Sequence, residues 1–573
     1  MRIARIRIER FRGFHNATII LPTNAVVAGE PQAGRSDLVE ALRRVLDSRS
    51  TRSRVNPLDI HRPAEDGAED PLTEIEVTLL DLGTELETLL DDSLETFDKA
   101  TGELAAAAHA VDAVLGVRIC YRARYDFETD TGDHWVDYPA RSEPAANVFK
   151  RASRIEREAL PVQFVDGVPA LQLRAEGALR TLLTETDSDG LDEALVDLDQ
   201  EVRAATSSFS ETAVVTNVLT KVIESGPRDL FGIDDPANIE FLPEDGSLAA
   251  LLRALQPAIA INTAGLLPVR SHGSTLQNVL SSAEAIAAAR DAESGIIIGD
   301  DFGDGLDASS SEHMAGLIHA TANQAILTTR RPEVVRAFNA EELIRLTTSH
   351  GTRQQHQLPV LTDKAGRVTR RLALDQLLSA LSTRTVVLVE GPLDAEGYGT
   401  LATRLFRKTS KREHSLSANG IRLVAPPGPE GGITRLPAIA EIALQLGFHV
   451  RAIVDNDKPG QEDPAVATLA GMVEQLIVLP MRTAVEAALI RGVPGDALRE
   501  TVETLRDLGM PALPDGMVDD DIAEHLITKK IIKKQGLVAA WVHALTRQPT
   551  VARSVIETVC GDSLGRIDIP EAT

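Results

Sequence analysis

Two pairs of carboxylates follow two apolar runs in the second half of the chain. One run ends in Glu390, with Asp394 four residues later, and the other ends in Asp455 and Asp457. Both runs have the composition of buried strands, and parallel strands bring their carboxyl ends to one edge of a sheet. Carboxylate oxygens are the ligands that Mg²⁺ or Mn²⁺ prefers. The pattern therefore predicts a site for two divalent metal ions, an arrangement that can neutralise both the attacking and the leaving oxygen of a phosphodiester.

A glycine-rich segment follows another apolar run near the start of the chain. Gly29-Glu-Pro-Gln-Ala-Gly34-Arg35-Ser36 matches the phosphate-binding pattern G-x-x-x-x-G-K-S/T, with arginine in the place of lysine, and leads into an amphipathic helical pattern. Glycines let backbone N–H groups surround phosphates, and a hydroxyl at the position of Ser36 ligates Mg²⁺. The segment predicts ATP binding, although the planar fork of Arg35 differs in geometry from an ammonium.

Further segments occur in the order found in ABC-type ATPases, which this half of the chain resembles. An apolar run ending in Asp300 and Asp301 resembles a Walker B strand, and Asp307 lies in a segment similar to a D-loop. Arg330 stands where the family has a switch histidine. Asp301 is one methylene shorter than the expected base and arginine cannot relay a proton, so we expect ATP to be bound as a regulatory ligand and hydrolysed slowly or not at all.

A serine- and glycine-containing segment precedes the Walker B-like strand. Ser271-His-Gly273-Ser-Thr-Leu-Gln277, followed by a helical pattern, resembles the ABC signature loop. In that family the signature loop contacts the γ-phosphate bound to a second subunit. The resemblance therefore assigns Ser271 and Gly273 to nucleotide binding and implies at least a dimer.

The two halves together resemble one family. Glu-Gly-x-x-Asp followed by Asp-x-Asp-x-x-Gly is similar to the Toprim signature of topoisomerases, primases and some nucleases. An ABC-type head before a Toprim domain resembles the OLD (overcoming lysogenization defect) nucleases and, within them, the nuclease subunits of Gabija antiphage systems. The resemblance implies an α/β protein: an ABC-type ATPase head with a helical insertion, followed by a C-terminal Toprim domain with a Rossmann-like parallel sheet.

The family pattern adds residues to the acidic site. It implies that Glu486 joins the metal ligands Glu390, Asp394, Asp455 and Asp457, with Asp519 to Asp521 as rivals for the role of Glu486. Relatives also use a late lysine against the scissile phosphate. Lys534 matches that position best and Lys533 next.

The expected activity is that of a nucleotide-regulated, divalent-metal-dependent endonuclease acting on double-stranded DNA in bacterial antiphage defence. The resemblance implies a homodimer or higher homo-oligomer and a helicase-like partner of superfamily 1. An ATP-sensing scaffold with an inactive Toprim site and a RecF- or SMC-like repair ATPase remain alternatives. A topoisomerase is disfavoured because it needs a tyrosine nucleophile on a separate domain, and the tyrosines do not provide one: Tyr121, Tyr125 and Tyr138 lie in the head and Tyr398 in a Toprim helix.

Composition limits the remaining possibilities. The chain of 573 residues exceeds a single core, and its two cysteines, Cys120 and Cys560, argue against a disulfide framework and for the cytoplasm. We expect no membrane span and no signal peptide. The net charge of −26 means that DNA would be bound locally. Candidate phosphate-binding residues form two basic clusters, Arg404, Arg407, Lys408, Lys411 and Arg412, and Lys529, Lys530, Lys533 and Lys534.

The motifs divide the chain into four segments. We expect residues 1–165 and 229–372 to form the two parts of the head, 166–228 a helical insertion with a role in dimerisation, and 373–573 the Toprim domain. We expect 84–112 and 373–382 to be helical. Strands are expected near 2–9, 16–21, 24–28, 73–80, 115–124, 385–389, 421–424, 449–454 and 475–479.

Overall fold

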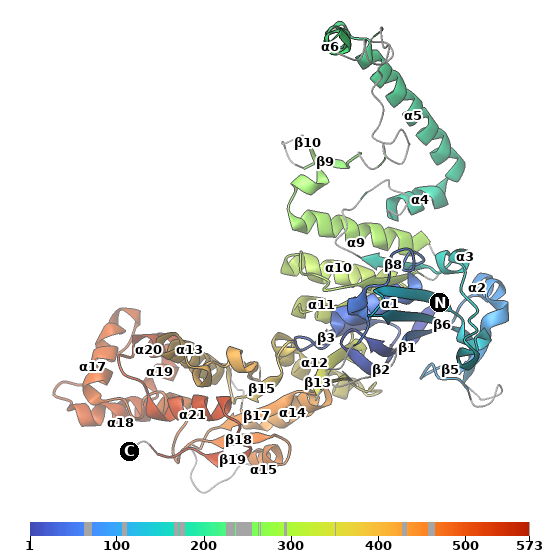
Figure 1. Cartoon of the computed structure of the whole chain (residues 1–573). Helices are drawn as coiled ribbons and strands as arrows, with labels where there is room; N and C mark the ends of the chain where they lie inside the picture. The colour runs from blue at the N-terminus through green and yellow to red at the C-terminus, as the bar shows by residue number, and fades with distance from the viewer. Residues whose placement is uncertain are drawn as a thin grey trace.

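The computed structural model describes most of the chain and arranges it as a head, a projecting helical arm and a C-terminal body (Figure 1). The described residues are all except 62–71, 106–111, 166–170, 172–177, 225–234, 236–251, 253, 254, 262, 264, 292–294, 350, 427–431, 457–463, 572 and 573.

An antiparallel sheet forms one layer of the head. Alternating residues of β1 are buried, which matches its period-two pattern of basic and apolar residues. In sheet order the strands are β2 (Phe14–Ile20), β1 (Arg2–Phe11), β4 (Thr73–Leu80), β6 (Ala113–Asp126) and β5 (Leu94–Asp98), with β7 (Thr131–Asp137) also paired to β6.

The prediction of a helix over residues 84–112 is wrong for most of that range. Helix α2 covers only Thr84–Leu89, and the chain then enters β5, which pairs antiparallel with β6. Phe97 of β5 is completely buried in a small cluster with Ala4 and Leu80. Sheet pairing and burial of this side chain outweigh the local helix propensity.

A mixed sheet forms the second layer of the head. Its strand order is β14 (Thr352–Gln357), β13 (Leu343–Ser349), β3 (Ala25–Gly29), β12 (Gln324–Thr328), β11 (Ile296–Gly299) and β8 (Val162–Val165). All neighbours are parallel except β13 and β14. Parallel strands buried on both faces read as continuous apolar runs, as β3 and β11 do.

Helices cover both faces of this mixed sheet. Helix α1 (Arg35–Leu46) lies between the two sheets and buries Leu38, Leu42 and Val45. The opposite face is covered by α9 (Ser274–Asp291), α10 (Ala308–Thr321), α11 (Pro332–Arg336) and α12 (Lys364–Leu377). The short α3 (Arg154–Glu158) precedes β8.

The arm rises from the head on the side of α9 (Figure 1). It consists of α4 (Ala178–Thr186), α5 (Ser188–Ser210) and α6 (Ala213–Glu224). Within 166–228, the described residues from 178 to 224 are therefore mostly helical, as expected, whereas Leu171 lies in a bend. A two-stranded ladder, β9 (Ala258–Ala260) with β10 (Leu266–Pro268), leads back to α9.

The C-terminal body is built on an entirely parallel sheet. Its order is β16 (Ile421–Val424), β15 (Thr385–Leu388), β17 (His449–Val454), β18 (Gln475–Val478) and β19 (Gly565–Asp568). The expected strands and the parallel arrangement are confirmed, whereas the edge strand β19 was not anticipated. One face packs on α14 (Leu436–Gln445) and α15 (Pro464–Ala470). The other packs on α13 (Pro392–Thr409), α16 (Val485–Ala488), α17 (Gly495–Thr504), α18 (Asp519–Lys529), α19 (Ile531–Lys534), α20 (Val538–Ala544) and α21 (Thr550–Cys560).

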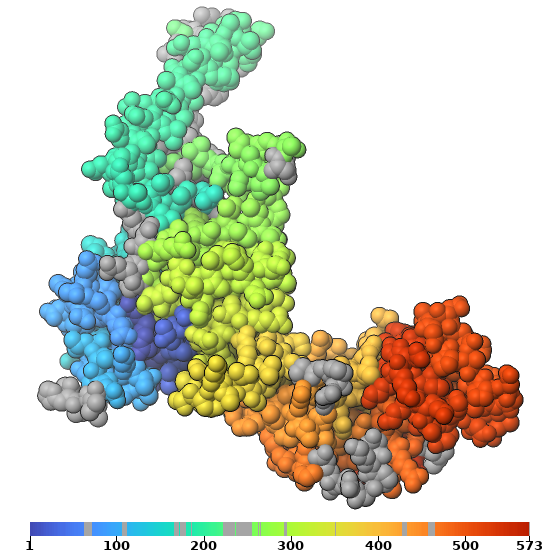
Figure 2. All heavy atoms as spheres, turned by 180° about the vertical axis from the view of Figure 1, so that it is seen from behind, coloured from blue at the N-terminus to red at the C-terminus, as the bar shows by residue number. Residues whose placement is uncertain are grey.

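The head and the C-terminal body share a hydrophobic core, which runs from the mixed sheet through α12 to α14. Figure 2 shows the corresponding continuity of the molecule from the yellow to the orange residues. Arg345 of β13 is completely buried at this junction and donates to the carbonyls of Leu446 at 2.8 Å and Thr383 at 2.6 Å. Its guanidinium lies 3.6 Å from the ring centroid of Phe448, and burial lowers its pKa to about 10. The junction is thus packed and hydrogen-bonded, not a loose tether.

Candidate functional site

The glycine-rich loop lies at the carboxyl edge of the mixed sheet, between β3 and α1. Gly34 has a φ of 92° and caps α1, and a Cβ there would lie 2.9 Å from the Cζ of Phe14. This conformation and this space suit only glycine. Gly29 ends β3, and Ser36 is exposed in the first turn of α1, where helix N–H groups point outward.

Arg35 is held by groups from the neighbouring strand ends. Its Nη1 donates to the Thr329 carbonyl at 2.8 Å, and its Nη2 lies 3.7 Å from Asp301 Oδ1. Arg330 approaches the other oxygen of Asp301, also at 3.7 Å, and forms an ion pair with Asp304. Burial raises the pKa of Asp301 and the charge of Arg35 opposes that rise. Asp301 therefore lies between two arginines.

The Walker B-like acids adopt a constrained backbone. Asp300 accepts a hydrogen bond of 2.6 Å from the Thr328 hydroxyl, and the same hydroxyl oxygen accepts from the Asp301 amide at 2.8 Å. Asp301 has a φ of 41°, in the left-handed region that non-glycine residues rarely adopt. Such strain persists where surrounding contacts fix it and is concentrated at functional sites.

The signature-like and D-loop-like residues are on the surface. Ser271 and Gly273 are exposed just before α9. Asp307 caps α10 by accepting from the Ser310 amide at 3.0 Å and its hydroxyl at 2.6 Å, which lowers the pKa of Asp307. Within one copy, Asp307 thus acts as a helix cap.

The second group of predicted residues meets at the carboxyl edge of the C-terminal sheet. Glu390 follows β15, Asp394 lies in the first turn of α13, Asp455 follows β17 and Glu486 lies on α16. The Asp455 amide donates to Glu390 Oε1 at 2.9 Å, which joins the two strand ends. We call Glu390, Asp394, Asp455 and Glu486 the acid cluster. Asp457 lies outside the described residues.

Two members of the acid cluster, Asp394 and Glu486, are buried, and Glu390 and Asp455 are half-buried. Asp394 is 8% exposed, and burial together with the charge of Glu390 raises its pKa to about 7, with a further rise from Glu486. Glu486 is 3% exposed, and neither of its carboxylate oxygens has a hydrogen-bond partner among the described residues. Buried carboxylates are costly unless a cation or hydrogen bonds compensate them. The donor set and this uncompensated burial fit a divalent cation.

Close helix packing brings Glu486 to the strand ends. Gly397 lies on the face of α13 that meets α16 and α20, and a Cβ there would lie 2.9 Å from Leu489 Cδ1 and 3.1 Å from Val538 Cγ1. The absence of a side chain at this position lets the helices approach. This approach places Glu486, which is far along the chain, beside Asp394.

The rivals of Glu486 lie elsewhere. Asp519, at the start of α18, is bound by Arg499, whose Nη2 lies 2.7 Å from its Oδ1. Asp519, Asp520 and Asp521 are all exposed. Glu486, and not this triplet, joins Glu390 in raising the pKa of Asp394.

The two candidate lysines differ in their surroundings. Lys533 and Lys534 are both exposed on α19, but it is the charge of Lys533 that lowers the pKa of Asp394. Adjacent positions on a helix point about 100° apart, so both cannot face the cluster equally. The structure thus favours Lys533 where the sequence ranked Lys534 first.

The two basic clusters differ in how far their side chains are engaged within the protein. The guanidinium of Arg404 donates to the carbonyls of Val542 and Leu545 at the end of α20, so this side chain ties two helices together and is not a phosphate contact. Lys411 pairs with Glu413 at 3.1 Å. The lysines at 529, 530, 533 and 534 are all exposed.

Tyr398 is a member of the site that the sequence did not indicate. It lies four residues after Asp394 on α13 and is 2% exposed. Burial, and then the charges of Asp455, Asp394, Glu390 and Glu486, raise the pKa of its phenol. Its spacing from Asp394 is the only sequence signal for this position.

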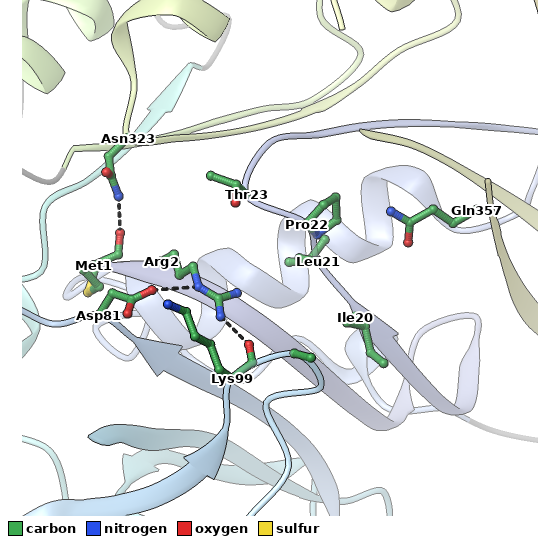
Figure 3. Close-up of a pocket in the computed structure, with 11 residues that line it drawn as sticks. Met1, Arg2, Ile20, Leu21, Pro22, Thr23, Asp81, Lys99, Asn323 and Gln357 are labelled. Atoms are coloured by element: carbon green, nitrogen blue, oxygen red, sulfur yellow. Dashed lines mark hydrogen bonds and ion pairs between the residues drawn. The ribbon is translucent and has the colours of Figure 1, made fainter. Parts of the chain in front are cut away.

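A separate cavity of about 750 Å³ opens on the head between the ends of its two sheets (Figure 3). Arg2 crosses it, pairing with Asp81 at 2.9 Å and donating to the Lys99 carbonyl at 2.6 Å. Its lining contains no residue of the loop or of the acid cluster. The cavity is therefore distinct from both candidate sites.

Comparisons with known proteins give a distant likeness of fold. No protein-family model and no curated protein matches the sequence. The chain is similar to the Smc head bound to the C-terminal winged-helix domain of ScpA, at 12% identity over 63% of this chain and 99% of that one, with a TM-score of 0.35. An Smc head with an extended coiled coil, bound to the C-terminal domain of ScpA and derived from Pyrococcus furiosus, is 11% identical over 64% of this chain and 98% of that one, with a TM-score of 0.35. The SMC head domain from Thermotoga maritima is 10% identical over 63% of this chain and 100% of that one, with a TM-score of 0.29. No helix of the described chain has the length and apolar character of a membrane span.

Proposed function

We propose that the protein is a divalent-metal-dependent DNA endonuclease whose cleavage site is the acid cluster and whose head binds ATP as a regulatory ligand. The observation that carries the proposal is the meeting of four carboxylates at one sheet edge, where Asp394 and Glu486 are buried and both oxygens of Glu486 have no hydrogen-bond partner among the described residues. Mg²⁺ or Mn²⁺ held by these carboxylates would supply charge neutralisation at a phosphodiester.

The surroundings of the cluster suit a polyanionic substrate. Lys533 lies near Asp394, and Lys529, Lys530 and Lys534 are exposed on the same two helices, α18 and α19. Exposed lysines contact phosphates without reading sequence, so they would hold DNA against the cluster despite the acidic net charge. Lys533 is the lysine we assign to the scissile phosphate.

The head suits nucleotide binding more than turnover. The loop presents its N–H groups at the N-terminus of α1, and Arg35 lies beside it. Asp301, in the place of the base, is held between Arg35 and Arg330 at 3.7 Å from each. Asp301 must leave both arginines before it can accept a proton from an attacking water, so we expect slow hydrolysis or none.

The junction supplies a route for regulation. Glu30, in the glycine-rich loop, accepts from the Thr348 amide at 2.5 Å and lies 3.4 Å from Arg384 Nε. Arg384 directly precedes β15, the strand that ends at the acid cluster. Nucleotide binding that moves the loop would therefore act on this strand.

The wider role follows the family resemblance. We propose cytoplasmic antiphage defence, assembly as a homodimer or higher oligomer and a helicase-like partner. The exposed Ser271 and Gly273 suit contact with nucleotide on a second copy. The projecting arm carries exposed apolar side chains, Phe209, Val214 and Val218 among them, that suit self-association.

The test is cleavage of supercoiled plasmid by purified protein with Mg²⁺ or Mn²⁺, with and without ATP. Wild type should nick or linearise the plasmid, and the Glu390→Ala/Asp455→Ala double variant should lose the activity while it still binds ATP. Equal cleavage by both proteins would refute the assignment of the site. An absence of metal-dependent cleavage by wild type under every condition, with ATP still bound, would favour the ATP-sensing scaffold.

A further inference from the structure

The choice of tyrosine at position 398 is not explained by packing alone, because its hydroxyl is buried. Its side chain is 2% exposed, and its hydroxyl has no hydrogen-bond partner in the described part of the chain. The surrounding charges are all those of the acid cluster. A buried hydroxyl without a partner costs stability, and phenylalanine would fill the same space without that cost.

The cluster contains the matching acceptors. Both oxygens of Glu486 are buried and without partners among the described residues, so an orphaned donor and orphaned acceptors occur in one site. Asp394 and Tyr398 are four residues apart on α13 and so lie on the same helix face. Burial also raises the pKa of the phenol, so the hydroxyl keeps its proton and remains a donor.

We propose that Tyr398 is a positioning residue of the acid cluster: when a divalent cation binds, its hydroxyl donates a hydrogen bond to a ligating carboxylate and fixes that carboxylate's orientation. Hydrogen bonds to metal ligands commonly change metal affinity by roughly 10–100-fold. This assignment rests on the proposed function, because it takes the acid cluster to be a metal site. The tyrosine does not attack the phosphodiester.

The test compares Tyr398→Phe with wild type in two measurements that do not require cleavage. Mn²⁺ affinity is measured by calorimetry on the full-length protein, and thermal unfolding is measured in EDTA. We expect Tyr398→Phe to bind Mn²⁺ about tenfold more weakly. Its metal-free melting temperature should equal or exceed that of wild type, because only an unpartnered hydroxyl is removed.

Tyr138→Phe is the matched control. Tyr138 is 1% exposed in the head, and the carboxylate that raises the pKa of its phenol is Glu156, outside the acid cluster. This variant should leave Mn²⁺ affinity unchanged. Equal loss of affinity in both variants would mean a general effect of removing a buried phenol and would overturn the proposal.

The outcomes also separate this inference from the proposed function. Mn²⁺ affinity of Tyr398→Phe within twofold of wild type, or a clear fall of its metal-free melting temperature, would overturn the role of Tyr398. If wild type and Glu390→Ala bind Mn²⁺ equally, the acid cluster is not the metal site, and both proposals fail. If Glu390→Ala loses Mn²⁺ affinity but Tyr398→Phe does not, the assignment of the acid cluster as a metal site is kept and only the proposed role of Tyr398 is rejected.

Discussion

The glycine-rich loop and the acid cluster are both built at the carboxyl ends of parallel strands, but their charges are balanced in opposite ways. In the head, Asp301 and Asp304 face Arg35 and Arg330, so the ions of the protein compensate one another. In the C-terminal body, carboxylates gather with one lysine nearby, and Asp394 keeps a pKa of about 7. The first region is stable without a ligand, and a ligand must displace its ion pairs. In the second, both carboxylate oxygens of the buried Glu486 have no hydrogen-bond partner among the described residues, so a cation could bind there without displacing an ion pair of Glu486.

The largest expected effect is stabilisation by metal. Mn²⁺ at 100 times its Kd should stabilise the folded protein by about 2.7 kcal/mol. This corresponds to roughly 5–10 °C in the melting temperature of a domain of the size of the C-terminal body. The measurement is thermal unfolding of EDTA-treated protein with and without MnCl2. Glu390→Ala should lose the shift, and an equal shift in that variant would break the comparison.

Neutralising one acid in each region should give opposite signs. Glu486→Gln removes a charge that repels Asp394 and should stabilise the metal-free protein by about 1–2 kcal/mol, while it weakens metal binding. Asp301→Asn removes the partner of two arginines and should destabilise by about 1 kcal/mol. Urea unfolding in EDTA measures both. The same sign for the two variants would show that the regions do not differ as described.

The two lysines of α19 should differ in cleavage. Lys533→Ala removes the ammonium whose charge lowers the pKa of Asp394 and should reduce plasmid cleavage by roughly tenfold or more. Lys534→Ala removes an exposed neighbour of the same charge and should reduce it by less than about threefold. Initial rates at one salt concentration provide the measurement. A larger loss in Lys534→Ala would restore the ranking made from the sequence.

The smallest effect is expected at Arg35. Arg35→Lys restores the usual phosphate-loop residue but leaves Asp301 and Arg330 in place. ATP affinity should change by less than about threefold, because the backbone N–H groups and the helix N-terminus that bind phosphate are left in place. Turnover should stay low. Calorimetry with ATP and a phosphate-release assay test this, and a large gain in turnover would show that Arg35, not the acids and Arg330, limits hydrolysis.

Much of the framework was predictable because it depends on local pattern. The apolar runs before Glu390, Asp455 and Asp300 are strands, and the amphipathic stretch after Gly34 is α1. The failure at 84–112 came from β5, whose residues lack a strong period and become a strand because β6 offers a partner. The edge strand β19 was missed for a related reason, since only β18 makes Gly565–Asp568 a strand.

The sequence by itself determined which residues can do chemistry and on which strand ends they lie, because residue type and hydrophobic period are local properties. Only the tertiary structure decided which of them share a site. It brought Glu486 to Asp394 through the packing at Gly397, and it bound the guanidinium of Arg404 to backbone carbonyls at the end of α20. Distance, burial and charge neighbours depend on how helices pack across the sheet, and no spacing along the chain encodes them.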